Sequence, residues 1–126
     1  MSAEQFLKSH QMEGRQLDKL LRLQAHLRDS HRALKQAGDP RAPDMLAEAA
    51  RLQDIILAQY QAMEVMRKRL QRYIDRLPDP KERAVLTLLY IRQFTMQETA
   101  HVMDFTPRHC SRIHRRALEH LEAFKL

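Results

Sequence analysis

The sequence predicts an all-α protein. Only two of the 126 residues are glycine and none is tryptophan, while leucine, glutamine, arginine, methionine and alanine are abundant. This composition favours helix over strand. Four of the five prolines fall in two short segments, 38–43 and 78–80, and almost no helix breaker lies between them. We therefore expect a long N-terminal antiparallel helical hairpin in residues 1–77, followed by a domain of three short helices in residues 78–126.

The two helices of the hairpin are expected at roughly 3–36 and 43–77. Polar residues interrupt the apolar seam of the first helix, and Gln24 and His31 there are expected either to set the pairing register or to lie at a solvated edge. In the second helix, apolar residues alternate steps of three and four, which indicates a coiled-coil-like seam. That seam consists of Ala49, Leu52, Ile56, Gln59, Met63, Met66, Leu70, Tyr73 and Leu77, of which only Gln59 is polar.

Both helices also carry apolar residues away from the seam. They are Met12, Leu21, Leu23, Met45, Leu46, Ile55, Leu57 and Tyr60. This surplus predicts a further partner surface, either a second copy of the hairpin or the C-terminal domain of the same chain. We expect a homodimer formed through residues 1–77.

Each of the three short helices begins with a recognisable cap. Asp79-Pro80-Lys81-Glu82 resembles a capping box and is expected to open a helix over 80–92, and Thr95-Met96-Gln97-Glu98 is expected to open a second over 96–103. Thr106-Pro107 is expected to open the third, which continues to residue 122. The short connection before it predicts a helix-turn-helix arrangement, in which the small Ala100 allows the last helix to cross closely.

The last helix has two opposite faces. Cys110, Ile113, Ala117 and Leu121 form an apolar face, which places the lone cysteine in the core. The opposite face is basic, with four arginines in the nine residues 108–116, and the whole chain has a net charge of +6. A helix with this pattern fits packing on a small core while facing a polyanion, and we expect double-stranded DNA.

Residues 79–121 resemble region 4 of bacterial sigma factors, and more closely the small phage- and prophage-encoded regulators with a region-4-like helix-turn-helix. The resemblance rests on Leu77-Pro78-Asp79, Arg83-Ala84-Val85-Leu86, Tyr90-Ile91, Phe94-Thr95, Glu98-Thr99-Ala100, Met103-Asp104-Phe105-Thr106, Arg108, Ile113-His114 and Ala117-Leu118. Thr99 stands where an aliphatic residue is usual, Asp104 where glycine is common, Leu89 where arginine is common, and Pro107 where a basic residue is common.

The resemblance implies a DNA-binding transcription regulator that also touches RNA polymerase, and it aligns Pro107, Arg108, Ser111 and Arg112 with the family's base-contacting turn. Arginine is the best bidentate partner of guanine, and the positions near the start of the helix can reach base edges. We therefore expect base contacts from Arg108, Ser111 and Arg112. We expect backbone contacts from Thr106, His109, Arg115 and Arg116.

Several other functions have no support in the sequence. The histidines at 101, 109, 114 and 120 lack metal-ligand spacing, so we expect no metal and no cofactor, and His114 is expected to be a packed boundary residue. No nucleophile or phosphate-loop motif indicates an enzyme. With a single cysteine, no signal peptide and no long apolar segment, the sequence favours the cytoplasm of a bacterial host.

Two rival functions stay open beside the dimeric regulator. One is a DNA-packaging adaptor similar to the small subunit of a phage terminase, which also joins a helix-turn-helix to an oligomerising helical part. The other is a module that binds RNA polymerase or a sigma factor without binding DNA.

Overall fold

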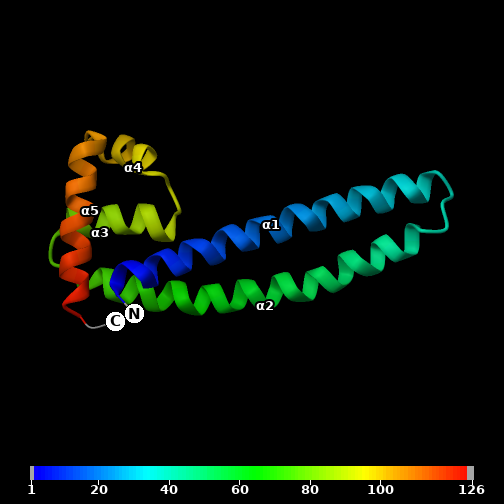
Figure 1. Cartoon of the computed structure of the whole chain (residues 1–126), viewed down its shortest axis with the longest axis horizontal. Helices are drawn as coiled ribbons and strands as arrows, with labels where there is room; N and C mark the ends of the chain where they lie inside the picture. The colour runs from blue at the N-terminus through cyan, green and yellow to red at the C-terminus, as the bar shows by residue number, and fades with distance from the viewer. Residues whose placement is uncertain (1, 125–126) are drawn as a thin grey trace. The chain divides into compact units, whose positions relative to one another are not determined.

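The computed structural model describes residues 2–124, which contain five α-helices, one π-helical turn and no strand. The order is α1 (Ala3–Gln36), α2 (Ala42–Asp75), α3 (Pro80–Leu86), η1 (Thr87–Ile91), α4 (Met96–Met103) and α5 (Pro107–Glu122) (Figure 1). The predicted all-α fold, with a long helix pair before a helix-turn-helix domain, is confirmed. No helix among the described residues combines the length and the hydropathy that a membrane span requires.

The chain divides into two compact units whose limits lie inside the long helices. One unit joins the described residues up to Met12 with those from Val65 onward, and the other is Glu13–Glu64. The assignment of partner binding to residues 1–77 and of DNA binding to residues 78–126 stays a prediction. The division into compact units describes packing and does not test what each part binds. The packing nevertheless shows that the helix-turn-helix unit includes parts of α1 and α2.

The Glu13–Glu64 unit is an antiparallel hairpin with a thin core. Gly38, with φ +68°, ends α1 in the left-handed conformation that glycine adopts at no steric cost, and Asp39 N–H then bonds to Leu34 O at 2.9 Å. Leu17, Leu52 and Ile56 form the buried cluster. Few residues are therefore fully excluded from water in this unit.

Two polar side chains on the α1 seam bond across the hairpin. The buried Gln24 donates from Nε2 to Gln53 Oε1, and His31 Nδ1 lies 2.9 Å from Ala42 O. Of the two predicted roles, the register-setting one fits these bonds, because a shift of one residue would break both.

The other unit has a larger core to which six elements contribute, α1, α2, α3, η1, α4 and α5. Leu7 of α1 and Leu70 and Ile74 of α2 are fully buried in the same cluster as Ile113 and Leu121 of α5. The backbone N–H of Ala3 also donates to Glu122 Oε2 at 2.6 Å, and Gln11 Nε2 donates to Leu89 O at 3.2 Å. The start of α1 is therefore a structural part of the helix-turn-helix unit, which the sequence pattern did not indicate.

The helix expected over 80–92 changes its hydrogen-bond pattern half-way. Residues 80–86 are α-helical, whereas Thr87–Ile91 form a π-helical turn in which Arg92 N–H bonds to Thr87 O at 3.0 Å. Gln93 then takes φ +58°, so the chain reverses toward α4 through a left-handed residue that is not glycine. Val85, Leu86, Leu89 and Tyr90 are buried as expected.

Leu7→Ala is expected to destabilise the helix-turn-helix unit by about 2–5 kcal/mol, because it opens a cavity in a fully packed site. The measurement is chemical denaturation followed by circular dichroism. Val102→Ala, which removes an exposed apolar side chain of α4, should change stability by less than about 0.5 kcal/mol. Equal stabilities of the two variants would contradict the placement of α1 in this core.

Candidate nucleic-acid interface

Helix α5 begins and packs as its sequence predicts. Thr106 is the N-cap, and its Oγ1 accepts a hydrogen bond from His109 N–H at 3.1 Å, while Pro107 occupies the first turn. Cys110, Ile113, Ala117 and Leu121 are all fully buried. Because these four residues fix which side of α5 faces the core, the opposite side faces solvent.

The turn before α5 is held by the backbone conformation of one residue. A complete capping box between Thr95 and Glu98 begins α4, as predicted. The helix ends at Asp104, which adopts the left-handed conformation with φ 57° and ψ 42°, and Phe105 N–H then bonds to Ala100 O at 2.9 Å. Aspartate tolerates this conformation better than most residues with a Cβ, which explains why it can replace glycine here.

The predicted contact residues are mainly exposed on one side of α5. Arg108, Ser111 and Arg112 are exposed near its start, and Arg115 and Arg116 are exposed one turn further on. Among the described residues, no carboxylate forms an ion pair with any of these four arginines. His109, Arg112, Arg115 and Arg116 together line a shallow hollow of ≈ 320 Å³. The structure thus brings uncompensated positive charge onto one open surface.

Two predicted backbone-contact residues are partly engaged within the protein. Thr106 Oγ1 accepts the His109 N–H, so its own hydroxyl hydrogen is left to donate. The half-buried His109 ring meets the Phe105 ring edge-on, with centroids 4.7 Å apart. Lys81 Nζ lies 5.9 Å from the centroid of the same Phe105 ring. Lys81 therefore adds a cation beside the start of α5, which the spacing of residues along the sequence could not reveal.

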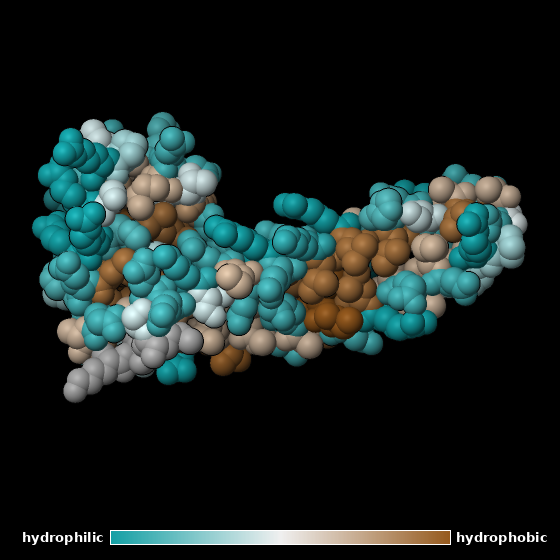
Figure 2. All heavy atoms as spheres, in the orientation of Figure 1, coloured by the Kyte–Doolittle hydropathy of each residue, from teal (hydrophilic) through white to brown (hydrophobic). Residues whose placement is uncertain are grey.

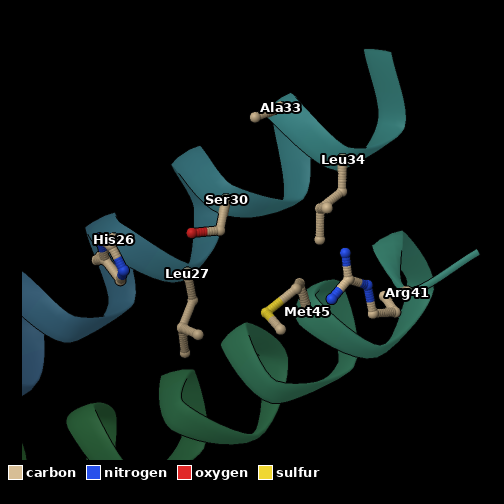
Figure 3. A pocket seen from close by; sticks show the side chains of 7 residues that line it. All are labelled: His26, Leu27, Ser30, Ala33, Leu34, Arg41 and Met45. Atoms are coloured by element: carbon tan, nitrogen blue, oxygen red, sulfur yellow. The ribbon is translucent and has the colours of Figure 1, made fainter. Parts of the chain in front are cut away.

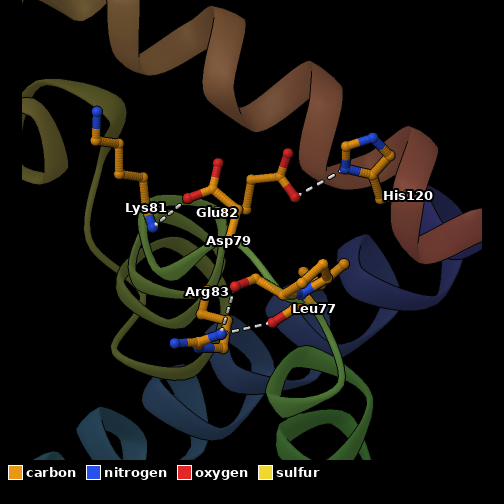
Figure 4. A network of polar contacts seen from close by, with 7 residues as sticks. Leu77, Asp79, Lys81, Glu82, Arg83 and His120 are labelled. Atoms are coloured by element: carbon orange, nitrogen blue, oxygen red, sulfur yellow. Dashed lines mark hydrogen bonds and ion pairs between the residues drawn. The ribbon is translucent and has the colours of Figure 1, made fainter.

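A polar network joins the start of α3 to the end of α5 (Figure 4). Asp79 Oδ1 accepts the Lys81 N–H at 2.9 Å, which confirms the predicted N-cap. The predicted role of Glu82 in a capping box is wrong, because this side chain is only 1% exposed and accepts from His120 Nδ1 at 2.9 Å. Packing against α5 outweighs local capping here, since a buried carboxylate needs a partner.

Arg83 makes the remaining contacts of this network. Its Nη1 donates to Leu77 O at 2.6 Å and to Pro78 O at 3.1 Å. The charged side chain thus satisfies two carbonyls that follow the end of α2 and orients α3 against it.

His114 and Cys110 both pack within the protein. His114 Nε2 lies 2.7 Å from Tyr90 Oη, and burial lowers the pKa of the imidazole, which favours its neutral form. Burial raises the pKa of the Cys110 thiol, so the reactive thiolate is disfavoured. Within residues 2–124, no three histidine, cysteine or carboxylate side chains are grouped so as to hold a metal ion.

The Thr99 side chain is a local departure from ideal packing. It is fully buried, and its Oγ1 has no hydrogen-bond partner among the described residues. In the family that the sequence resembles, an aliphatic residue is usual at this position. The buried surroundings of Thr99 explain why an apolar side chain suits it.

The geometry agrees with a comparison against known families. Residues 73–123 match the family model described as Sigma-70, region 4. This segment is similar to helix-turn-helix domains of the region 4 type. Region 4 of sigma-70 is a DNA-binding domain and is not catalytic. Searches among curated proteins and among solved structures give no match to the chain.

Asp104→Ala is expected to lower the free energy of unfolding by about 1 kcal/mol, because alanine adopts the left-handed conformation only at a steric cost. Asp104→Gly should leave stability unchanged or raise it slightly. Thermal denaturation of the three proteins side by side tests this. An alanine variant as stable as the glycine variant would show that the left-handed turn is not the constraint.

Proposed function

We propose that the protein is a sequence-specific double-stranded DNA-binding transcription regulator that reads the major groove with residues 106–122. The observation that carries this proposal is the exposed, uncompensated arginine face of α5 within a region-4-type helix-turn-helix unit. A buried apolar face on the same helix holds these side chains at a fixed orientation, which lowers the entropic cost of binding.

Within this proposal, the start of α5 reads bases. Arg108 and Arg112 are one helical turn apart and exposed, and Ser111 lies beside them. Each guanidinium can donate two parallel hydrogen bonds to guanine O6 and N7. The later arginines, Arg115 and Arg116, fit phosphate contacts, because a recognition helix contacts base edges mainly with its N-terminal residues.

The start of α5 also suits a phosphate. Pro107 has no N–H and the His109 N–H donates to Thr106 Oγ1, so the Arg108 N–H is the one left for an anion, which the helix dipole also favours there. Thr106 and His109 flank this position. We propose that both contact the DNA backbone.

Arg112→Ala is expected to cost about 1–3 kcal/mol of binding free energy and to relax the preference at one base pair, whereas Arg116→Ala should weaken binding to all sequences alike. The measurement is a binding titration on duplexes that carry single substitutions across a site selected from a random library. If both variants weakened every duplex by the same factor, the division into base and backbone contacts would be refuted.

The same titrations separate this function from a module that binds RNA polymerase or a sigma factor alone. A DNA-binding protein loses affinity steeply as salt rises, since phosphate contacts release counterions. Absence of salt-dependent affinity for any duplex would favour the polymerase-binding alternative. Contact with RNA polymerase in addition to DNA, and a phage or prophage origin, remain predictions from the resemblance.

We further propose that the protein is a homodimer through its hairpin. In the Glu13–Glu64 unit, the predicted surplus residues Leu21, Leu23, Leu46, Ile55, Leu57 and Tyr60 are all exposed. Figure 2 shows apolar side chains gathered on one face of this hairpin. This apolar surface of the unit supports a second copy of the hairpin as its partner, and the C-terminal domain of the same chain stays the alternative.

Three of the exposed residues share one flank of α2. At ~100° per residue, Leu46, Leu57 and Tyr60 of α2 fall within about 60° of one another, on one side of the buried seam. A hollow of ≈ 440 Å³ lies between the two helices toward the closed end of the hairpin (Figure 3). It is lined by His26, Leu27, Ser30, Ala33, Leu34, Arg41 and Met45. Packing of this surface against the same surface of a second copy would bury the flank, which is exposed to solvent in a single hairpin.

Leu21→Lys combined with Leu57→Lys is expected to convert a dimer into a monomer, because it puts charge into the proposed interface. Sedimentation equilibrium should give twice the 15.0 kDa mass of one chain for the unmodified protein and once that mass for the variant. The control is Val102→Lys, on an exposed apolar residue of α4, which should stay dimeric. A monomeric unmodified protein would refute the dimer, and a ring of many copies would favour the packaging adaptor.

A dimeric regulator would present two reading helices to the DNA. Their half-sites are expected to be separated by about one helical turn, ~34 Å, or a multiple of it.

A further inference from the structure

A second basic surface lies on the C-terminal end of α2 and on Arg76, the residue that follows it, outside the helix-turn-helix itself. Arg69, Arg72, Tyr73 and Arg76 line one hollow of ≈ 350 Å³ in the unit that also contains α5. The spacing i, i+3, i+4 and i+7 explains why they share a face of the helix. Leu70 and Ile74, which are fully buried, turn the other face of α2 into the core.

Aromatic rings hold two of these guanidinium groups in place. Arg76 Cζ lies 4.4 Å from the centroid of the Phe124 ring and 6.0 Å from that of Tyr73, and Arg69 Cζ lies 5.6 Å from the centroid of Phe6. Arginine on an aromatic ring keeps its N–H donors free at the edge of the plane. The rings thus restrict the side chains without using their hydrogen-bonding capacity.

No carboxylate neutralises this surface within the described part of the chain. None of the ion pairs there includes Arg69, Arg72 or Arg76, and the neighbouring Asp75 accepts instead from Gln71 Nε2 at 2.9 Å. Three uncompensated guanidinium groups and a phenolic hydroxyl around one hollow provide many donors and no negative charge. Such a surface suits a ligand with repeated anionic oxygens.

We propose that Arg69, Arg72 and Arg76 bind the phosphate backbone of the duplex outside the base pairs that α5 reads. This inference rests on the proposed DNA-binding function. A duplex is favoured over an acidic polypeptide because both basic surfaces belong to one compact unit, and because Arg76 packs on Phe124, just beyond the end of α5. Along the axis of α5, Arg112 and Phe124 are ~18 Å apart at 1.5 Å per residue. That distance is comparable with about five base pairs at 3.4 Å each.

The test compares two duplex lengths with a triple variant, Arg69→Gln/Arg72→Gln/Arg76→Gln. One duplex has about 10 base pairs and contains only those that α5 reads, and the other extends the same site to about 25. On the long duplex, the variant should bind at least about 10-fold more weakly, and the slope of log affinity against log salt should fall by about 2–3, near 0.9 for each lost phosphate contact. On the short duplex, the affinity should stay within about twofold.

A matched control removes the same charge elsewhere. Arg22→Gln/Arg28→Gln/Arg32→Gln changes three exposed arginines of α1 in the other unit and should leave binding to both duplexes nearly unchanged. Arg69→Lys/Arg72→Lys/Arg76→Lys, which keeps the charge, should recover part of the lost affinity. Circular dichroism and thermal denaturation establish that each variant is folded.

Several results would overturn the inference. Equal binding of the triple variant and the unmodified protein to the long duplex would do so while leaving the α5 function intact, because Arg112→Ala would still weaken binding to both lengths. An equal loss of affinity in the α1 control variant would show that only the lower net charge of the protein weakens binding. Binding of polyglutamate that requires the three arginines, with duplex affinity unchanged, would assign the surface to an acidic protein. If the unmodified protein bound neither duplex, both proposals would fail.

Discussion

Burial of one face of α5 is the constraint on which the rest of the structure depends. Ile113 and Leu121 lie in a core that draws on α1, α2, α3, η1 and α4, and this core fixes the rotation of α5 about its own axis. Because the arginines lie opposite, the same packing that stabilises the unit also decides what faces solvent. The caps at Thr95 and Thr106 and the left-handed Asp104 then set where the helices begin and end. Fold and candidate interface are therefore two results of one apolar pattern.

The two compact units differ in how completely they satisfy their own apolar surface. The helix-turn-helix unit excludes water from a continuous cluster, whereas the hairpin buries Leu17, Leu52 and Ile56 and leaves other large apolar residues such as Leu57 and Tyr60 exposed. Two helices have too little mutual surface to cover apolar residues on their flanks. The buried Gln24 fits a hairpin whose pairing register is specified. The exposed apolar residues on its flanks fit a surface that binds a partner.

Much of the fold followed from the order of residues, and what did not follow has a physical reason. The bounds of α1 and α4 agree with the prediction because caps, prolines and apolar spacing are local properties. The π-helical turn and the positive φ of Gln93 were missed, since neither has a local sequence signature. Within this turn, Leu89 O accepts a hydrogen bond from Gln11 of α1, a contact that residue spacing along the chain does not reveal. Glu82 was misassigned for the same reason, because its partner His120 is far away in sequence. The arginine face of α5 could be predicted from periodicity, whereas Lys81 and the Arg69–Arg76 surface required tertiary structure.

The position of Ala3 and Leu7 in the core has a consequence for how the chain is made. Ala3 bonds to Glu122, which is 119 positions away in the sequence, so residues made early must wait for residues made much later. The stretch Glu13–Glu64 can pair with itself much earlier, since its contacts are closer in sequence. During synthesis the Glu13–Glu64 hairpin would thus be complete while the unit that contains α5 still lacks part of its core.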